Sequence, residues 1–170
     1  MLTNLANLVA FQVSWFSCVL GAAKGLGWTG PLVTAVLLTL HLRFLPAPAR
    51  YLRFCAAVGL IGLAIDTALG AFGVFAFHAT PFPSWVCPLW LTALWIMFAS
   101  TLPLSLNWLA ERPRLGALLG AIGGPASYYA GATLGALDLP GHTVTSLLIL
   151  ASVWGILMPA LMHLKNRMGL

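Results

Sequence analysis

One acidic residue, Asp66, lies inside a long apolar run, whereas the other two acids, Glu111 and Asp138, lie in polar turns. A carboxylate in the middle of a membrane costs about 2.5–3.5 kcal/mol on insertion scales, so such a residue is usually paired or functional. We therefore expect Asp66 either to tie helices together or to serve as a proton, cation or head-group site. Glycines at helical spacing share its face and predict that it points at a packed neighbour: Gly59, Gly62, Gly70 and Gly73.

A second candidate is the sequence Gly123-Gly124-Pro125, in the middle of another apolar run. Pro125 removes one backbone donor and displaces the carbonyl group of Ala121, which predicts an interrupted helix. Interrupted helices in membranes often line binding sites, although a tolerated kink with tight packing is the alternative. Ser127 and Tyr128 follow within one turn and would place hydroxyl groups near the break.

The depth of Asp66 limits its partners, because it lies about 22 Å along its helix at about 1.5 Å per residue. Trp95, Ser127 and Tyr128 are expected at a similar depth. An Asp66–His41 pair would resemble a proton relay, with an interfacial His41 as the alternative. The candidate ligand or proton site therefore comprises Asp66, Gly123, Gly124, Pro125, Ser127, Tyr128, Trp95 and His41.

Other chemistry finds little support in the residue pattern. Ser127, His41 and Asp66 could be assembled into a hydrolytic triad, but the motif that exposes a nucleophilic serine is missing. The sequence shows no metal-ligand spacing, phosphate loop or carboxylate pair, so no cofactor is expected. Trp15, Trp95 and Trp154 lie deep in their segments and predict either core packing or an aromatic pocket for an apolar ligand.

The composition is that of a membrane protein. Of the 170 residues 61% are hydrophobic and 6% are charged, and the mean hydropathy is +0.97, whereas soluble domains carry about 25% charged residues. The net charge of +5 could suggest nucleic-acid binding, but the basic residues lie between apolar runs and form no basic-aromatic surface. We expect no nucleic-acid partner.

The elements that must position these residues are six apolar helices joined by short turns. They are predicted over residues 5–23, 30–44, 51–77, 85–109 (kinked at Pro103), 115–137 and 143–163. The predicted fold is all-α: residues 1–170 form a single domain, a polytopic bundle of six transmembrane helices. The glycine faces of the third and fifth helices are expected to meet or to frame one cavity, with Asp66 near Ser127 and Tyr128.

The distribution of lysine and arginine predicts the orientation of this bundle. The second turn, the fourth turn and the C-terminal tail are expected on the same side of the membrane, and together they carry seven basic residues. The first, third and fifth turns carry only Lys24. The seven are Arg43, Arg50, Arg53, Arg112, Arg114, Lys165 and Arg167. Because basic loops stay on the cytoplasmic side, both termini are predicted to be cytoplasmic.

Several segments together resemble a bacterial family of small membrane proteins, the domain of unknown function 2878. They are residues 11–23 (FQVSWFSCVLGAA), the helix of Asp66, residues 98–108 (FASTLPLSLNW) and residues 120–131 (GAIGGPASYYAG). The family has no established activity. Its genes often lie near enzymes resembling cyclopropane-fatty-acid synthases and flavin amine oxidases, so the resemblance implies a part in lipid modification.

These observations lead to three hypotheses. The first is a protein of the bacterial inner membrane that binds or moves a lipidic or small amphipathic molecule in a lipid-modification pathway. The second is a substrate-capture subunit similar to the S components of energy-coupling-factor transporters, which are six-helix proteins of similar length. The third is an intramembrane enzyme, although no convincing catalytic set is present. The expected partners are membrane lipid, a small hydrophobic or amphipathic ligand, and a membrane protein or a second copy of the chain.

Overall fold

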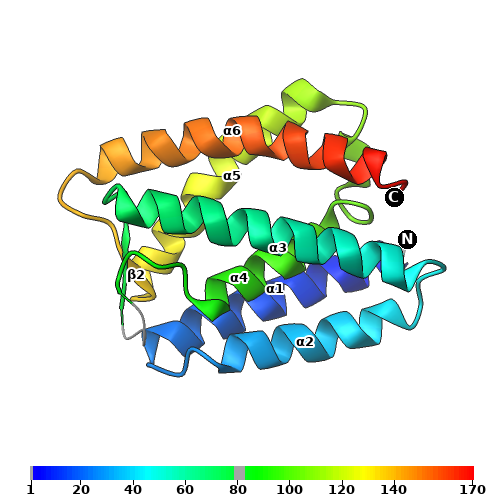
Figure 1. The fold of residues 1–170 in the computed structure, drawn as a ribbon, viewed down its shortest axis with the longest axis horizontal. Helices are drawn as coiled ribbons and strands as arrows, with labels where there is room; N and C mark the ends of the chain where they lie inside the picture. Colours follow the sequence, from blue (N-terminus) through cyan, green and yellow to red (C-terminus); the bar gives the residue numbers. More distant parts are fainter. Residues whose placement is uncertain (1, 79–82) are drawn as a thin grey trace.

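A computed structural model describes residues 2–78 and 83–170, and the described residues form six α-helices (Figure 1). The elements in chain order are α1 (Leu2–Ala23), α2 (Thr29–Leu42), α3 (Pro48–Ala71), β1 (Ala76–Phe77), α4 (Leu89–Thr101), the 3₁₀ turn η1 (Asn107–Leu109), α5 (Pro113–Thr133), β2 (Leu137–Asp138) and α6 (Thr143–Arg167). The predicted all-helical class and the order of the six helices are confirmed.

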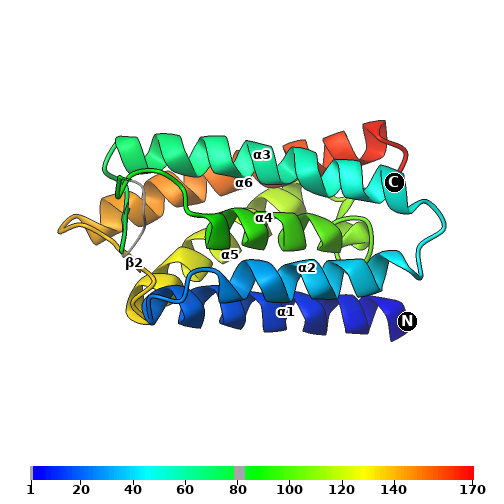
Figure 2. The same ribbon diagram turned by 60° about the horizontal axis from the view of Figure 1, so that its bottom comes forward.

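The helices are arranged as two units. α4 lies at the centre of the first, where it packs against α1, α2 and α3, and alternate residues along much of its length are buried. α5 and α6 form the second unit, a hairpin whose backbones approach each other closely but approach α1–α4 at few points. Figure 2 shows α5 and α6 beside the four-helix unit. We call the boundary between the two units the seam.

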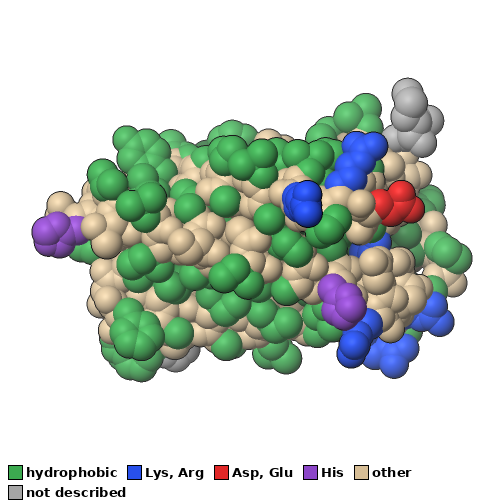
Figure 3. All heavy atoms as spheres, turned by 90° about the horizontal axis from the view of Figure 1, so that it is seen from above, with side chains coloured by type: hydrophobic (Ala, Val, Ile, Leu, Met, Phe, Trp, Pro, Cys, Tyr) green, Lys and Arg blue, Asp and Glu red, His purple; other side chains and the backbone are tan. Residues whose placement is uncertain are grey.

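The outer surface of the molecule is largely apolar. Large hydrophobic side chains are exposed on all six helices, and the apolar residues are spread over the middle of the face shown in Figure 3. Three helices of the described chain are long and apolar enough to cross a membrane, over Thr3–Ala23, Pro48–Ala71 and Thr143–Arg167. These helices make a membrane protein the natural interpretation of the fold.

The seven basic residues outside Lys24 gather at one end of the bundle. They lie at the C-terminal ends of α2 and α6, at the N-terminal ends of α3 and α5, or in the turns beside them. Figure 3 shows this gathering of lysine and arginine side chains, with an acidic residue among them. We call it the basic end; Glu111 is the one acidic residue whose position in the chain places it there.

The third and fourth helices are shorter than predicted. α3 ends at Ala71, because Gly73 adopts a left-handed φ of 72° and the amide of Val74 returns to the carbonyl of Leu69, the hydrogen-bond pattern of a Schellman cap. α4 ends at Thr101 and does not continue as a kinked helix, since Pro103 has no amide with which to extend it.

A two-stranded ladder joins the two units at the end opposite the basic end. α5 ends as α3 does, with Gly135 at φ 84°, and the residues after the two caps pair as antiparallel β1 and β2. Ala76 lies opposite Asp138, and Phe77 lies opposite Leu137. These strands were not predicted, because two residues are too few to show an alternating pattern.

The glycine faces of α3 and α5 neither meet nor frame one cavity, contrary to prediction, since no α3 residue lines the cavity beside α5. A Cβ atom on Gly62 of α3 would overlap the Trp95 ring of α4, and one on Gly124 of α5 would overlap the Trp154 ring of α6. Each glycine face therefore receives an aromatic side chain from the partner helix within its own unit. The two tryptophans then meet each other across the seam.

Candidate functional site

Asp66 is held by two hydrogen bonds in the interior of the protein. The indole Nε1–H of Trp95 donates to Oδ2 over 2.7 Å, and the hydroxyl of Tyr128 donates to Oδ1 over 2.6 Å. The exposed fractions are 0% for Asp66, 2% for Trp95 and 6% for Tyr128. The expectation that Asp66 faces a packed neighbour at the level of Tyr128 is therefore met.

Local packing explains this arrangement. Gly62 lies one helical turn before Asp66 on α3, and its missing side chain leaves the space that the Trp95 ring occupies. Phe75 stacks on Tyr128 with ring centroids 5.3 Å apart and an interplanar angle of 26°, which fixes the phenol against the carboxylate. The glycine spacing on α3 thus has a specific function: it lets an indole approach the backbone and reach the acid.

The position of the Asp66 carboxylate suits it to fix the side chains of Trp95 and Tyr128 by hydrogen bonds. Burial opposes a negative charge on Asp66, whereas both hydrogen-bond donors stabilise one. Each oxygen already accepts a hydrogen bond, and Asp66 is not among the residues that line the adjacent cavity. Its two partners do line that cavity, so Asp66 acts on it indirectly, as a positioning residue.

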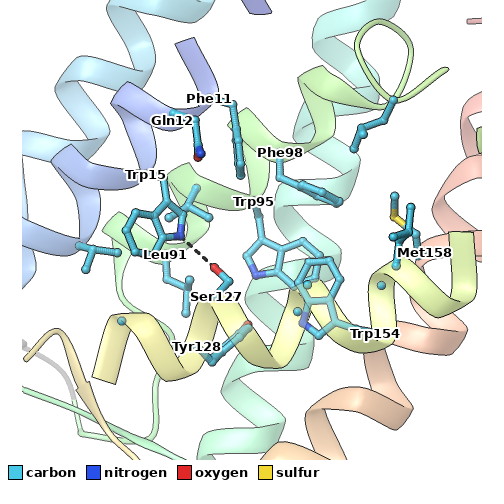
Figure 4. Close-up of a pocket in the computed structure, with 18 of the residues that line it drawn as sticks. Phe11, Gln12, Trp15, Leu91, Trp95, Phe98, Ser127, Tyr128, Trp154 and Met158 are labelled. Carbon is cyan, nitrogen blue, oxygen red and sulfur yellow. Dashed lines mark hydrogen bonds between the residues drawn. The ribbon is translucent and has the colours of Figure 1, made fainter. Parts of the chain in front are cut away.

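The cavity lies in the seam between the two units and has a volume of about 460 Å³. Its walls are largely aromatic and aliphatic and come from α1, α4, η1 and its preceding turn, α5, β2 and α6. Figure 4 shows the main side chains, which include Phe11, Trp15, Trp95, Phe98, Ser127, Tyr128, Trp154 and Met158. Binding sites for small molecules commonly have volumes of about 300–1,000 Å³ and similarly apolar walls.

The contacts that cross the seam around this cavity include two hydrogen bonds and a stacked pair of rings. The first is the hydrogen bond from Tyr128 of α5 to Asp66 of α3. In the second, the rings of Trp95 and Trp154 stack with centroids 4.7 Å apart and an interplanar angle of 11°. The third is shown as a dashed line in Figure 4, where Nε1–H of Trp15 on α1 donates to Oγ of Ser127 over 2.9 Å.

The cavity reaches the outer surface of the bundle between α1 and α5. Four of its lining residues are exposed: Gln12 and Phe16 on α1, and Leu119 and Gly123 on α5. The walls also run along the molecule, since lining positions on α5 extend from Leu119 to Gly131, about 18 Å of helix. The cavity is therefore an elongated space with an opening on the side of the bundle.

α5 passes through Pro125 as a continuous helix, so the predicted interruption is wrong. Pro125 itself is buried and does not line the cavity, whereas Gly123 and Gly124 do. The two glycines have different effects: Gly124 allows close packing, and Gly123 leaves open space. At Gly124 the missing Cβ admits Trp154, and at Gly123 no atom lies within 4 Å of a Cβ position.

His41 does not pair with Asp66. It lies in the last turn of α2 at the basic end, where its ring centroid is 6.0 Å from that of Tyr51. Its Nε2 atom is buried without a hydrogen-bond partner, and the Tyr51 hydroxyl donates instead to the carbonyl of Ser100. The proton relay between His41 and Asp66 is therefore excluded in this structure.

Of the eight predicted site residues, five line one cavity: Trp95, Gly123, Gly124, Ser127 and Tyr128. The residue pattern did not indicate Phe11, Phe98 and Met158 as wall residues. For Trp15 and Trp154 it was compatible with either core packing or a pocket. No pattern within one helix could single out such residues, because the wall forms only where separate helices meet. Within the described parts of the chain, no group of three or more His, Cys, Asp or Glu side chains could hold a metal ion.

Comparison with known proteins identifies a family that covers most of the chain. The family described as "Protein of unknown function (DUF2878)" matches residues 4–160. No curated protein and no solved structure matches the chain. The matched region runs from α1 into α6 and contains every residue named as lining the cavity. The chain therefore belongs to the DUF2878 family of proteins of unknown function.

Proposed function

We propose that the protein crosses the bacterial inner membrane with all six helices and has both termini in the cytoplasm. The apolar outer surface and the length of α1, α3 and α6 support the membrane location. The gathering of seven basic residues at one end supports the orientation. α2 and α4 have 14 and 13 residues and cover about 20 Å each, so adjoining turns complete their crossings.

Within this membrane protein, the seam cavity holds an apolar or amphipathic molecule, such as a lipid or a molecule with a lipid-like chain. One observation carries this proposal: a cavity of about 460 Å³ with aromatic walls opens through the apolar side of the bundle. A hydrophobic molecule in the bilayer could enter there without passing through water. The elongated form of the cavity suits a chain better than a compact polar metabolite.

The polar groups at the opening give the site a means of selection. The Gln12 side chain lies beside Phe11 and Trp15 at the cavity (Figure 4) and is exposed on the apolar side of the bundle. An amide facing hydrocarbon is unfavourable unless it finds a hydrogen-bond partner. A hydroxyl, carbonyl or ester group of the bound molecule would supply one. A role in lipid modification, which the family resemblance implied, remains a prediction.

Native mass spectrometry of the purified full-length protein in mild detergent tests this proposal. The wild-type protein should retain a co-purified molecule. Gly123→Leu should lose it, because Gly123 lines the cavity and a Cβ atom there meets no neighbouring atom within 4 Å, so the added bulk takes space from the bound molecule. Ala126→Leu is the matched control, since it adds bulk to the exposed face of the same helix away from the cavity.

The proposal fails if the wild-type protein carries no molecule after mild extraction and takes up none from added lipid extract. It also fails if Gly123→Leu and Ala126→Leu retain the same molecule to the same extent. If the wild-type protein does retain a molecule, organic extraction of the purified protein would identify the chemical class of that molecule.

A further inference from the structure

A lysine is buried at the basic end, away from the seam cavity. Lys165 lies in the last turn of α6 with an exposed fraction of 2%, and its ammonium group donates a hydrogen bond to Oδ1 of Asn107, the first residue of η1. An ammonium group has three N–H donors, and burial of a positive charge is costly unless the charge is paired. In the structure the ammonium group of Lys165 has one neutral acceptor, Oδ1 of Asn107.

No acidic side chain in the described parts of the chain neutralises Lys165. The described residues contain the ion pair of His78 with Asp138, at 2.9 Å, but this pair lies at the opposite end of the bundle from Lys165. Asp66 lies deep in α3 and is fully engaged by Trp95 and Tyr128. Lys165 is thus a buried cation without a resident anion.

Lys165 also lines a polar pocket of about 620 Å³ that is distinct from the seam cavity. Its other polar walls are Asn4, Ser105, Asn107, Asn166 and Glu111. The side-chain amides can donate hydrogen bonds to a ligand that the ammonium group attracts by charge, whereas the Ser105 hydroxyl already donates to Oδ1 of Asn7. Glu111 is exposed and makes no ion pair with the lysine.

The surroundings of the pocket favour negative charge. Arg112 lies next to Glu111 in the chain, and its guanidinium carbon is 5.9 Å from the ring centroid of Trp108, another wall residue. The remaining arginines of the basic end lie on the same end of the molecule (Figure 3). Their summed field raises the local concentration of anions.

We propose that the pocket around Lys165 binds an anionic group, a phosphate or a carboxylate. The group could belong to the head of a membrane lipid or to a free anion, since both offer the same acceptor oxygens. The proposal does not depend on the function of the seam cavity, because the two sites share no lining residue. Leu106 and Leu109 line the cavity, whereas Asn107 and Trp108 between them line the pocket.

The test compares the unfolding midpoint of the full-length protein with and without two anionic probes. One probe is inorganic phosphate, titrated at constant ionic strength against chloride. The other is phosphatidylglycerol in nanodiscs, compared with phosphatidylcholine. Stabilisation by phosphate would identify a free-anion site, and stabilisation by phosphatidylglycerol alone would identify a head-group site.

Lys165→Met should weaken the apparent affinity for the active probe by about ten- to a hundred-fold, the effect of losing a charged hydrogen bond. Arg167→Met removes the same charge from an exposed position of the same turn and should change the affinity by less than about three-fold. An absence of stabilisation by both probes, or equal losses in the two variants, would overturn the proposal.

A second variant keeps the proposal testable if Lys165→Met does not fold. Asn107→Asp places a carboxylate against the Lys165 ammonium group and so supplies the anion from within the chain. This variant should be more stable than the wild type without any probe and should lose its response to the active probe. A full response in Asn107→Asp would show that the anion does not bind at Lys165.

Discussion

Replacement of Asp66 by alanine should destabilise the protein by about 2–6 kcal/mol. The change removes the acceptor of two buried donors, Trp95 Nε1–H and the Tyr128 hydroxyl, which then have no partner. Each buried group left unsatisfied costs about 1–3 kcal/mol, and the two costs add to the stated range. Asp66→Asn keeps one acceptor oxygen and gains an amide that can donate to the Tyr128 oxygen, so its cost should be lower.

Equilibrium unfolding of the purified full-length variants in mixed micelles, with an increasing fraction of denaturing detergent, measures these differences. Ser152→Ala is a suitable control, because Ser152 is exposed on α6 and bonds only to the Leu148 carbonyl of its own helix. We expect it to lie within about 0.5 kcal/mol of the wild type. Tyr128→Phe combined with Asp66→Ala should cost less than the sum of the single changes, since the double variant no longer buries an unpaired hydroxyl.

Two results would refute this reasoning. An Asp66→Ala protein as stable as the wild type would mean that the carboxylate does not hold the two donors. Equal stability of Asp66→Asn and Asp66→Ala would mean that the acceptor oxygen is irrelevant and that only the charge matters.

Three further predictions follow from the packing and the charge distribution. Gly62→Ala should destabilise the protein by about 1–3 kcal/mol in a thermal unfolding assay, because its Cβ overlaps the Trp95 ring. Gly123→Ala, with no atom within 4 Å of the new Cβ, should instead be neutral or stabilising. Equal changes in stability for Gly62→Ala and Gly123→Ala would show that the overlap with Trp95 does not determine the effect. Trp15→Phe removes the hydrogen bond to Ser127 and should speed release of the co-purified molecule by about three- to eighteen-fold, measured by timed native mass spectrometry; unchanged release would exclude this contact as a barrier. Alkaline phosphatase fused in the turn between α5 and α6 should be active, whereas a fusion at the C-terminus should be inactive; the reverse pattern would invert the topology.

The sequence predicts the helices well because their signal is local. Each helix is a continuous apolar run bounded by glycine, proline or charge, and these boundaries need no knowledge of the partners. The face of Asp66 was predictable for the same reason, since the spacing of Gly59 and Gly62 shows which side of α3 packs closely. The approach of Tyr128 also follows from depth, which is set by the chain itself.

The partners of each glycine face were not predictable. A row of glycines indicates that something packs closely, but the same row accommodates a helix backbone or a tryptophan ring equally well. On α3 and α5 the occupants are Trp95 and Trp154, and each comes from a helix whose own pattern looks uniformly apolar. The cavity was hidden for the same reason, because it exists only where the two units fail to fill the space between them.

Pro125 shows a different limit of sequence analysis. A proline in an apolar helix favours a break in isolation, yet α5 continues through it. Close packing of α6 along the glycine face of α5 stabilises the helical backbone on both sides of Pro125. Tertiary contacts thus outweigh the local preference of the residue.

The short β1–β2 ladder has a consequence for how the seam could widen. It attaches the residues after α3 to those after α5, and one residue of each strand, Phe77 and Leu137, is buried. The two units are thus joined by backbone hydrogen bonds at that end. At the basic end the chain itself joins them through the short turn between η1 and α5. Side-chain contacts add to this link, among them those of Lys165 with Asn107 and of Arg50 with the Gly169 carbonyl. The two units are therefore fastened at both ends of the seam, and a widening of the seam would be largest between these ends, beside the cavity.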